Sequence, residues 1–533
     1  MQYASKKYSI ETTDYYVGQD NTKKWGFDIH TPVFLISSGL ILAFLIAVLS
    51  TNPATAKAAI DQVRNGIMNQ FDDLFMWSTN FFLIFALILT FSPFGKIRLG
   101  GKDAVPEHST KSWISMLFAA GMGSGVLFWS VAEPAADFTN WYYMPLNATP
   151  NSPATEPLAL ATTIFHWGIH GWAIFALVAL GLAFFCFNKG LPLSMRSIFY
   201  PIMGDRAWGW FGHIIDILSV LATLFGLVTS LGIGAQQATS GINHVFGTHG
   251  GLGMSLLVIA VVTLITIGSV ARGINGGVKL LSNINMYFAF ALFVFLVIVT
   301  HSIAWDSLKM AVSGYIENII PLSNTVGRDD KDWMHAWTVF YWAWWISWSP
   351  FVGTFIARVS RGRTVREFLI AVMVLPTLVI VLWMAVFGGL ALDQIVNKVG
   401  ELGTNGLTDI SLTLFYIYDQ LPLGNVLSIL SIFLILVFFI TSSDSGSLVI
   451  DSITAGGKVD SPLPQRVFWA TLEGAIAATM LWVGGEQSLQ ALQSGVVVTG
   501  LPFTFVLLLM CVSLVMGLRS EYQVYHAPKV ATA

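Results

Sequence analysis

Charged residues and cysteines are both scarce in this sequence. Asp, Glu, Lys and Arg make up only 11% of the 533 residues, whereas a soluble globular protein contains about 25%. The net charge of -3 argues against a nucleic-acid partner. The 2 cysteines, Cys186 and Cys511, allow at most one disulfide and form no metal-spaced pair. This composition excludes an ordinary soluble domain, a disulfide framework and a cysteine metal site.

Hydrophobic residues, by contrast, make up 55% of the chain. An apolar run of about 20 residues is long enough to cross a lipid bilayer as a helix. We predict twelve such spans, at about 33–50, 74–92, 112–131, 160–187, 211–237, 252–271, 283–303, 333–357, 367–392, 422–443, 465–484 and 496–517. Within 304–332, the stretch from Trp305 to Ile320 is typical of an amphipathic helix lying on the membrane. The chain is therefore predicted to be an all-α integral membrane protein.

The distribution of Lys and Arg predicts the orientation of these spans. If the amino terminus is cytoplasmic, most of the 27 basic residues fall in cytoplasmic segments. Residues 1–32 lack the apolar core of a cleaved signal peptide and are interpreted as a cytoplasmic tail. Residues 518–533 form a short tail that we also expect on the cytoplasmic side.

The segment 333–368 carries an unusual series of aromatic residues. They recur at steps of three and four, which places them on one face of a helix; they are Trp337, Tyr341, Trp344, Trp345 and Trp348. Such a face can enclose a quaternary ammonium, which offers no hydrogen-bond donor and gains about 0.5–2 kcal/mol from each ring. The alternative is a membrane-interface belt, which predicts rings near the helix ends and all around the helix. Rings along one face and into its middle favour the cage.

The end of this segment changes character. Pro350 and Gly353 are expected to disturb the helix. Four arginines follow directly, at Arg358, Arg361, Arg363 and Arg366.

Three glycines alternate in the middle of the span 112–131, at Gly121, Gly123 and Gly125. Each glycine costs about 1 kcal/mol relative to alanine in a helix interior. Together they indicate unwound backbone, whose N–H groups can hold a carboxylate and whose carbonyl groups can hold Na⁺. Small-residue helix packing is the alternative, because Gly121 and Gly125 also satisfy that spacing.

Other polar residues inside the spans were weighed as metal, ion or catalytic groups. His166 and His170 have a metal-compatible spacing, but no third ligand is evident, so we expect them to be hydrogen-bonded in a polar pocket. The hydroxyls of 441–445 lie beside Asp444, and hard oxygens suit Na⁺. An enzyme would need a nucleophile, a metal cluster or a paired acid and base. The sequence offers only these residues and the isolated Glu133 and Glu473, so we expect neither an enzyme nor an organic cofactor.

Three motifs together give this chain a family resemblance: GMGSG followed by EP, HWGIHGW, and WAWWISWSPF followed by RVSRGRTVREF. With them the sequence resembles the betaine–choline–carnitine transporter family over nearly its whole length. The resemblance implies a leucine-transporter-type fold, with two leading helices in 33–92 and two inverted five-helix repeats in 112–303 and 333–517. It also implies a bacterial inner (plasma) membrane location and a homotrimer.

The resemblance further implies a substrate site. The aromatic box consists of Trp167, Trp172, Phe175 and Trp345, and the same path is lined by Trp344 and Trp348. Betaine-transporting members usually have Tyr where this chain has Phe175. The glycine segment that would hold the substrate carboxylate comprises Gly121, Gly123, Ser124 and Gly125.

The coupling ion implied by the resemblance is Na⁺. One site uses the carbonyl groups of Ala119, Met122 and Phe438 with the hydroxyls of Thr441 and Ser442. A second site near Phe351 pairs two hydroxyls, of which Thr223 matches the first and Leu227 replaces the other. Sodium-independent carnitine exchangers place an Arg in the span 211–237, and this chain has no Lys or Arg there. That difference favours ion coupling.

We therefore predict Na⁺-coupled import of a quaternary-ammonium zwitterion, with glycine betaine first, for osmoprotection or nutrition. Choline-transporting members can carry Asp at the last position of the glycine motif, where this chain has Gly125. The alternatives are choline or carnitine transport, proton coupling and exchange. A channel or a membrane enzyme belongs to a different class.

Overall fold

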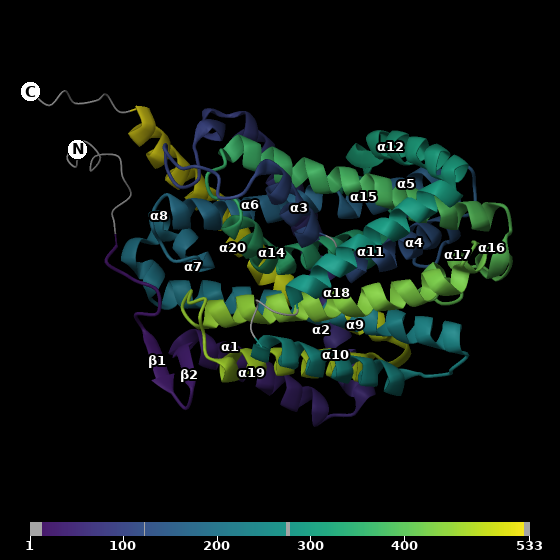
Figure 1. The fold of residues 1–533 in the computed structure, drawn as a ribbon, viewed down its shortest axis with the longest axis horizontal. Helices are drawn as coiled ribbons and strands as arrows, with labels where there is room; N and C mark the ends of the chain where they lie inside the picture. The colour runs from purple at the N-terminus through teal and green to yellow at the C-terminus, as the bar shows by residue number, and fades with distance from the viewer. Residues whose placement is uncertain (1–12, 122, 273–277, 527–533) are drawn as a thin grey trace, which may run out of the picture.

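The computed structural model describes residues 13–121, 123–272 and 278–526, and their regular secondary structure is helical apart from one short hairpin (Figure 1). By length and composition, 10 helices among the described residues can cross a membrane. They are α1 (Thr31–Leu49), α2 (Pro53–Phe91), the joined pair α5 (Thr155–Trp167) and α6 (Ile169–Phe187), α9 (Trp210–Phe246), α10 (Leu252–Arg272), α11 (Val278–Val299), α15 (Val365–Val396), α18 (Gly424–Thr454), α19 (Leu463–Gly484) and α20 (Ser488–His526). The protein is an all-α multi-pass membrane protein.

Two of the twelve expected spans fall short of those criteria, and they are the two with unusual sequences. The span 112–131 is divided into α3 (Thr110–Gly121) and α4 (Ser124–Thr139), each too short to cross a bilayer alone. The span 333–357 consists of α13 (Lys331–Met334), the π-helical turn η4 (His335–Val339) and α14 (Phe340–Arg358). Tryptophan and serine lower the mean hydropathy of α14.

A break also divides the predicted span 160–187, which the sequence analysis treated as one helix. Gly168 separates α5 from α6, with φ -92° and ψ -141°. A Cβ at this position would lie 2.5 Å from the Ile164 carbonyl oxygen. The chain therefore needs glycine to turn away from the preceding helix there.

Pro350 does not break its helix, contrary to our expectation. It lies inside α14, which continues to Arg358. Proline lacks the N–H that would donate to the Ile346 carbonyl oxygen. The Ser349 hydroxyl donates to that oxygen instead, at 2.7 Å, so the acceptor is satisfied and the helix continues.

The aromatic helix α14 lies in the middle of the bundle (Figure 1). It packs against α6, α9 and α20, while α18 packs along α9. Most of its side chains are buried, including Trp342, Trp344 and Trp345. Every face of this helix therefore meets protein rather than lipid along much of its length.

The remaining elements are shorter or lie at the periphery. They are α7 (Met195–Ile198), α8 (Tyr200–Met203), α12 (His301–Ser323), α16 (Gly400–Asn405), α17 (Thr413–Asp419), η1 (Pro93–Lys96), η2 (Pro145–Asn147), η3 (Gly204–Trp208) and η5 (Gly485–Gln487). Helix α12 occupies the place of the expected amphipathic helix and packs on α5 and α15 (Figure 1). Its exposed apolar residues include Trp305, Ile316 and Ile320.

The segment predicted as a polar tail contains an ordered hairpin. Strands β1 (Asn21–Lys24) and β2 (Phe27–His30) pair antiparallel. The Asn21 amide donates to the Ala455 carbonyl oxygen at 2.9 Å, and the Asp28 N–H donates to Gln465 Oε1 at 3.2 Å. The hairpin thus fastens the amino-terminal segment to the loop that follows α18 and to the first turn of α19.

The arginines after α14 hold two loops together. The Arg363 guanidinium donates to Glu367 Oε1 at 2.6 Å and to the His108 carbonyl oxygen at 2.7 Å. It also lies 4.5 Å from the centre of the Trp113 ring. The charged end of α14 therefore has a structural role, because it secures the start of α3.

Candidate substrate and ion sites

An aromatic cavity lies where the α3–α4 break meets α5, α6, α9 and α14. Its empty volume, counted together with space that opens to solvent, is about 450 Å³. It is lined by Gly123, Gly125, Val126, Trp167, Phe175, Ser230, Trp344, Trp345 and Trp348. None of these described lining residues is charged.

The lining rings meet at steep angles and so enclose a space. Trp345 lies 4.5 Å from Phe175, at an interplanar angle of 52°. The ring centre of Trp167 is 5.9 Å from that of Trp345, with an interplanar angle of 73°, and 5.8 Å from that of Trp344, with an angle of 82°. Trp348 continues the wall, 6.3 Å from Trp344. Rings inclined in this way can turn several faces toward one small ligand, and cation–π binding uses the ring faces.

Trp172 belongs to the same ring cluster but does not line the cavity. It is 1% exposed and meets Phe175 at 85° and Trp345 at 63°. It therefore supports the two rings from behind.

Two indole N–H groups anchor the wall to neighbouring helices. The Trp345 Nε1–H donates to the His166 carbonyl oxygen at 2.8 Å, and the Trp344 Nε1–H donates to the Gly226 carbonyl oxygen at 3.2 Å. These bonds hold the ring orientations while leaving the π faces free.

Three glycines allow the indoles to lie close to the adjoining backbone. A Cβ at Gly125 would lie 2.9 Å from Trp167, and a Cβ at Gly171 would overlap the Trp345 indole. Gly226 has the same relation to Trp348. The sequence analysis singled out Gly125 but missed Gly171 and Gly226. The only local sign of Gly171 was its place inside the HWGIHGW motif.

The predicted carboxylate-binding segment is only partly described. Gly123 and Gly125 line the cavity. Met122 lies outside the described residues, as do the surroundings of positions 119, 121 and 124. These are the positions of Ala119, Gly121 and Ser124.

The predicted Na⁺ ligands on α18 line a second cavity, of about 700 Å³. Phe438, Thr441, Ser442 and Phe351 all lie on it, and Trp348 lines both cavities. The Thr441 hydroxyl donates to the carbonyl oxygens of Val437 and Phe438, at 2.9 and 3.1 Å. Hydroxyls inside helices often make such bonds. The hydroxyl-bearing residues Thr441 and Ser442 thus line a cavity that shares Trp348 with the aromatic cavity.

Thr223 and Asp444 lie apart from this second cavity. Thr223 is buried on α9, and its hydroxyl has no hydrogen-bond partner among the described residues. Leu227 faces Gly446 on α18, where a Cβ would overlap it. Asp444 is buried on α18 but is not among the residues that line the cavity. The second Na⁺ site near Phe351 therefore stays a prediction.

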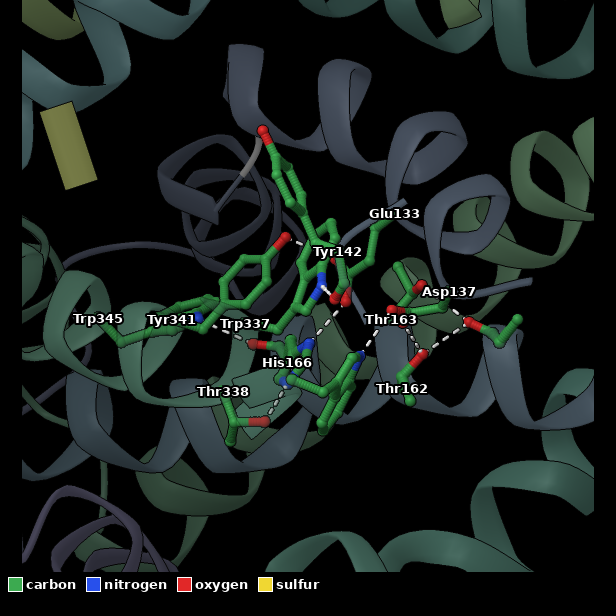
Figure 2. Close-up of polar contacts among 12 residues, drawn as sticks. Glu133, Asp137, Tyr142, Thr162, Thr163, His166, Trp337, Thr338, Tyr341 and Trp345 are labelled. Carbon is green, nitrogen blue, oxygen red and sulfur yellow. Dashed lines mark hydrogen bonds and ion pairs between the residues drawn. The ribbon is translucent and has the colours of Figure 1, made fainter. Parts of the chain in front are cut away.

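Both histidines of the HWGIHGW motif have hydrogen-bond partners. His166 Nδ1 lies 2.5 Å from Glu133 Oε1, and Nε2 lies 2.9 Å from the Thr338 hydroxyl (Figure 2). His170 Nε2 lies 3.4 Å from the Ser323 hydroxyl. Among the described residues, no group of three or more His, Cys, Asp or Glu could hold a metal ion.

These helices and cavities define a multi-pass membrane protein with an aromatic cavity between its helices. The chain belongs to the BCCT family of betaine/carnitine/choline transporters, whose sequence model matches residues 32–523. It is a transporter and not an enzyme.

Named relatives are similar over almost the entire chain. A glycine betaine/proline/choline/ectoine transporter of Vibrio parahaemolyticus is 70% identical, with 99% of this chain and 94% of that protein covered. Glycine betaine transporter 1 of the same organism is 64% identical, with 97% and 99% covered.

A solved structure of a Na⁺-coupled sialic acid symporter has a TM-score of 0.47 at 14% identity, with 84% of this chain and 86% of that chain covered. A likeness at this level assigns neither the fold nor the coupling ion.

Proposed function

We propose that this transporter imports glycine betaine, or a closely related quaternary-ammonium zwitterion, by Na⁺ symport, for osmoprotection or nutrition. The observation that carries the proposal is the cavity walled by Trp167, Trp344, Trp345 and Trp348 without a charged lining residue. A trimethylammonium group has no N–H to donate, so ring faces are its natural partners. The names of the two relatives support the same class of substrate.

The broken helix supports a place for the substrate carboxylate. Helix α4 begins at Ser124, and its N-cap Gly123 provides no side-chain acceptor. The first N–H groups of a helix without a cap are free to bind an anion. An ammonium in the ring cavity and a carboxylate at this helix start match the two ends of a betaine.

Na⁺ coupling is supported by the second cavity, because Trp348 lines both it and the aromatic cavity. An ion bound by Thr441 and Ser442 would stabilise the state with high substrate affinity, which is coupling by differential affinity. The proposal includes two inverted repeats in 112–303 and 333–517, both termini in the cytoplasm of a bacterial cell, and a homotrimer.

Isothermal titration calorimetry on the purified protein tests this function. We expect glycine betaine to bind more tightly in Na⁺ than in K⁺, and uptake into proteoliposomes to rise with an inward Na⁺ gradient. Trp345→Leu should weaken binding roughly tenfold, since one desolvated cation–π contact contributes about 1–2 kcal/mol. Uptake that does not respond to Na⁺ would contradict Na⁺ coupling. Wild-type affinity in the Trp345 variant would contradict a role for Trp345 in binding the ammonium group.

Choline is the second candidate, because the 70% identical relative is named for choline, proline and ectoine as well. An Asp at position 125 would have to displace Trp167, which a Cβ there would approach to 2.9 Å. The choline-type Asp therefore fits this cavity only if the Trp167 ring moves. Competition of choline, carnitine and proline against bound glycine betaine ranks the ligands.

A further inference from the structure

A buried network around an acidic side chain lies behind the aromatic wall, and the rings of Tyr341 and His166 separate it from the cavity. Glu133 on α4 is 0% exposed, and its carboxyl group bonds on both sides. Tyr341 donates its hydroxyl to Oε2 at 2.5 Å, and His166 Nδ1 lies 2.5 Å from Oε1 (Figure 2). Glu133 does not line the cavity. It is the Glu of the EP that follows GMGSG, but the resemblance gave it no role.

Both partners of this carboxyl group contact the cavity wall. The Tyr341 ring lies 5.6 Å from Trp167 and 6.2 Å from Trp344. His166 accepts the indole N–H of Trp345 through its own carbonyl oxygen, at 2.8 Å. Through these two residues Glu133 is linked to three tryptophans that line the cavity, Trp167, Trp344 and Trp345.

No Lys or Arg contacts Glu133 among the described residues. Its neighbour Asp137 is also buried, and Trp333 Nε1 and the Thr162 hydroxyl donate to it at 2.8 and 2.5 Å. Arg328 lies 5.5 Å from the Trp333 ring, but it pairs with Asp330 at 2.6 Å. A buried carboxylate inside a membrane protein is costly unless a cation or a proton compensates it.

We propose that Glu133 is the counter-charge of the transported ammonium group, and this inference rests on the proposed function. The neutral rings provide the surface that the cation touches. The carboxylate behind them provides negative charge that the lining lacks. In this state neutral His166 donates from Nδ1 to Glu133 and accepts the Thr338 hydroxyl at Nε2.

The competing state has a neutral carboxyl group that donates a proton to His166 Nδ1, while His166 donates from Nε2 to Thr338. The same distances accommodate both states. They differ in one property, which is whether a net cation in the cage feels a negative charge. Glu133→Gln reproduces the neutral state at nearly constant shape, because an amide can also donate to His166 and accept from Tyr341.

The net charge of the ligand separates an electrostatic role from a structural one. Choline is a net cation, whereas the ammonium and carboxylate of glycine betaine respond to Glu133 with opposite signs. In Glu133→Gln we expect the Kd of choline to rise about tenfold and that of glycine betaine less than about threefold. A structural role alone would weaken both ligands equally.

Titration calorimetry with both ligands in saturating Na⁺ measures this ratio in the wild type, Glu133→Gln, Glu133→Asp and Asp137→Asn. Glu133→Asp keeps the charge and should keep the ratio. Asp137→Asn, the matched comparison, removes a neighbouring buried carboxyl group that makes no hydrogen bond to Tyr341 or His166, and should change the ratio less than Glu133→Gln does. Equal changes for the two ligands in Glu133→Gln, or no change, overturn the counter-charge.

The wild-type protein provides a second readout if Glu133→Gln does not fold. Protonation removes the same charge, so the ratio of the choline Kd to the glycine betaine Kd should rise as pH falls from 8 to 5. A constant ratio contradicts the inference. Failure of the wild type to bind either ligand would instead contradict the proposed function, so the two failures are distinguishable.

Discussion

At the scale of single residues, the aromatic wall depends on what is missing beside each ring. Gly171 lies on α6 directly behind Trp345, and its lack of a side chain lets the indole sit against the helix. The spacing of Trp344, Trp345 and Trp348 could be predicted because it is a local property of one helix. The pairing of Gly171 with Trp345 could not, because it depends on how α6 and α14 pack.

Gly171→Ala tests this dependence on a missing side chain. The new Cβ must displace the Trp345 ring, so we expect glycine betaine affinity to fall about tenfold or more, as loss of one or two cation–π contacts implies. Gly39→Ala is the matched control, because Gly39 lies in helix α1 with nothing within 4 Å of an added Cβ. It should bind normally and be no less stable. Normal affinity in the Gly171 variant would show that the ring can move without cost.

At the scale of elements, spans could be predicted better than their interruptions. Apolar length identified ten of the membrane helices. The unwound glycine segment was predicted as one of two alternatives, and the described structure does break the helix before Ser124. The turn at Gly168 was missed, because one glycine in an apolar helix is as compatible with packing as with a break. The continuation of α14 past Pro350 was also missed. It depends on the Ser349 hydroxyl, which bonds to the carbonyl oxygen that the proline leaves without a donor.

The loop that follows α14 gives a prediction at this scale. Arg363 is 4% exposed, and its bonds to Glu367 and His108 join the end of α14 to the segment before α3. Arg363→Ala should lower the free energy of unfolding by about 1–3 kcal/mol, because the buried guanidinium no longer packs on Trp113 and two partly exposed acceptors lose their donor. Thermal unfolding in detergent measures the effect.

The control for this variant is Arg361→Ala. Arg361 pairs with Glu107 at 3.0 Å, but the two side chains are 51% and 45% exposed. Exposed pairs contribute about 0–1 kcal/mol, so this variant should unfold close to the wild-type temperature. Equal losses in both variants would contradict the role given to burial.

At the scale of the whole molecule, the amino-terminal hairpin ends in a buried histidine that links it to α7. His30 is 0% exposed, and Arg196 Nη1 donates to its Nε2 at 3.3 Å. Burial lowers the pKa of His30 to about 3, and the charge of Arg196 adds to the effect. No sequence signal indicated this contact, because the first thirty residues are polar and lack periodicity.

A pH dependence of stability follows from the depressed pKa of His30. Between about pH 6.5 and 3 the unfolded chain binds a proton that the folded protein excludes, so stability falls as pH falls. We expect the unfolding temperature to drop between pH 7 and 5, and His30→Gln to reduce that drop. The exposed His249 provides the control, because His249→Gln should leave the drop unchanged. An identical drop in the His30 variant would assign the effect to other groups.

The hairpin also constrains how the chain is made. Asn21 bonds to a residue 434 positions later, so the first strand leaves the ribosome long before its partner exists. At about 5–20 residues per second, the wait is roughly 20 to 90 s. The hairpin can therefore dock only late in synthesis, once the helices up to α18 have been made.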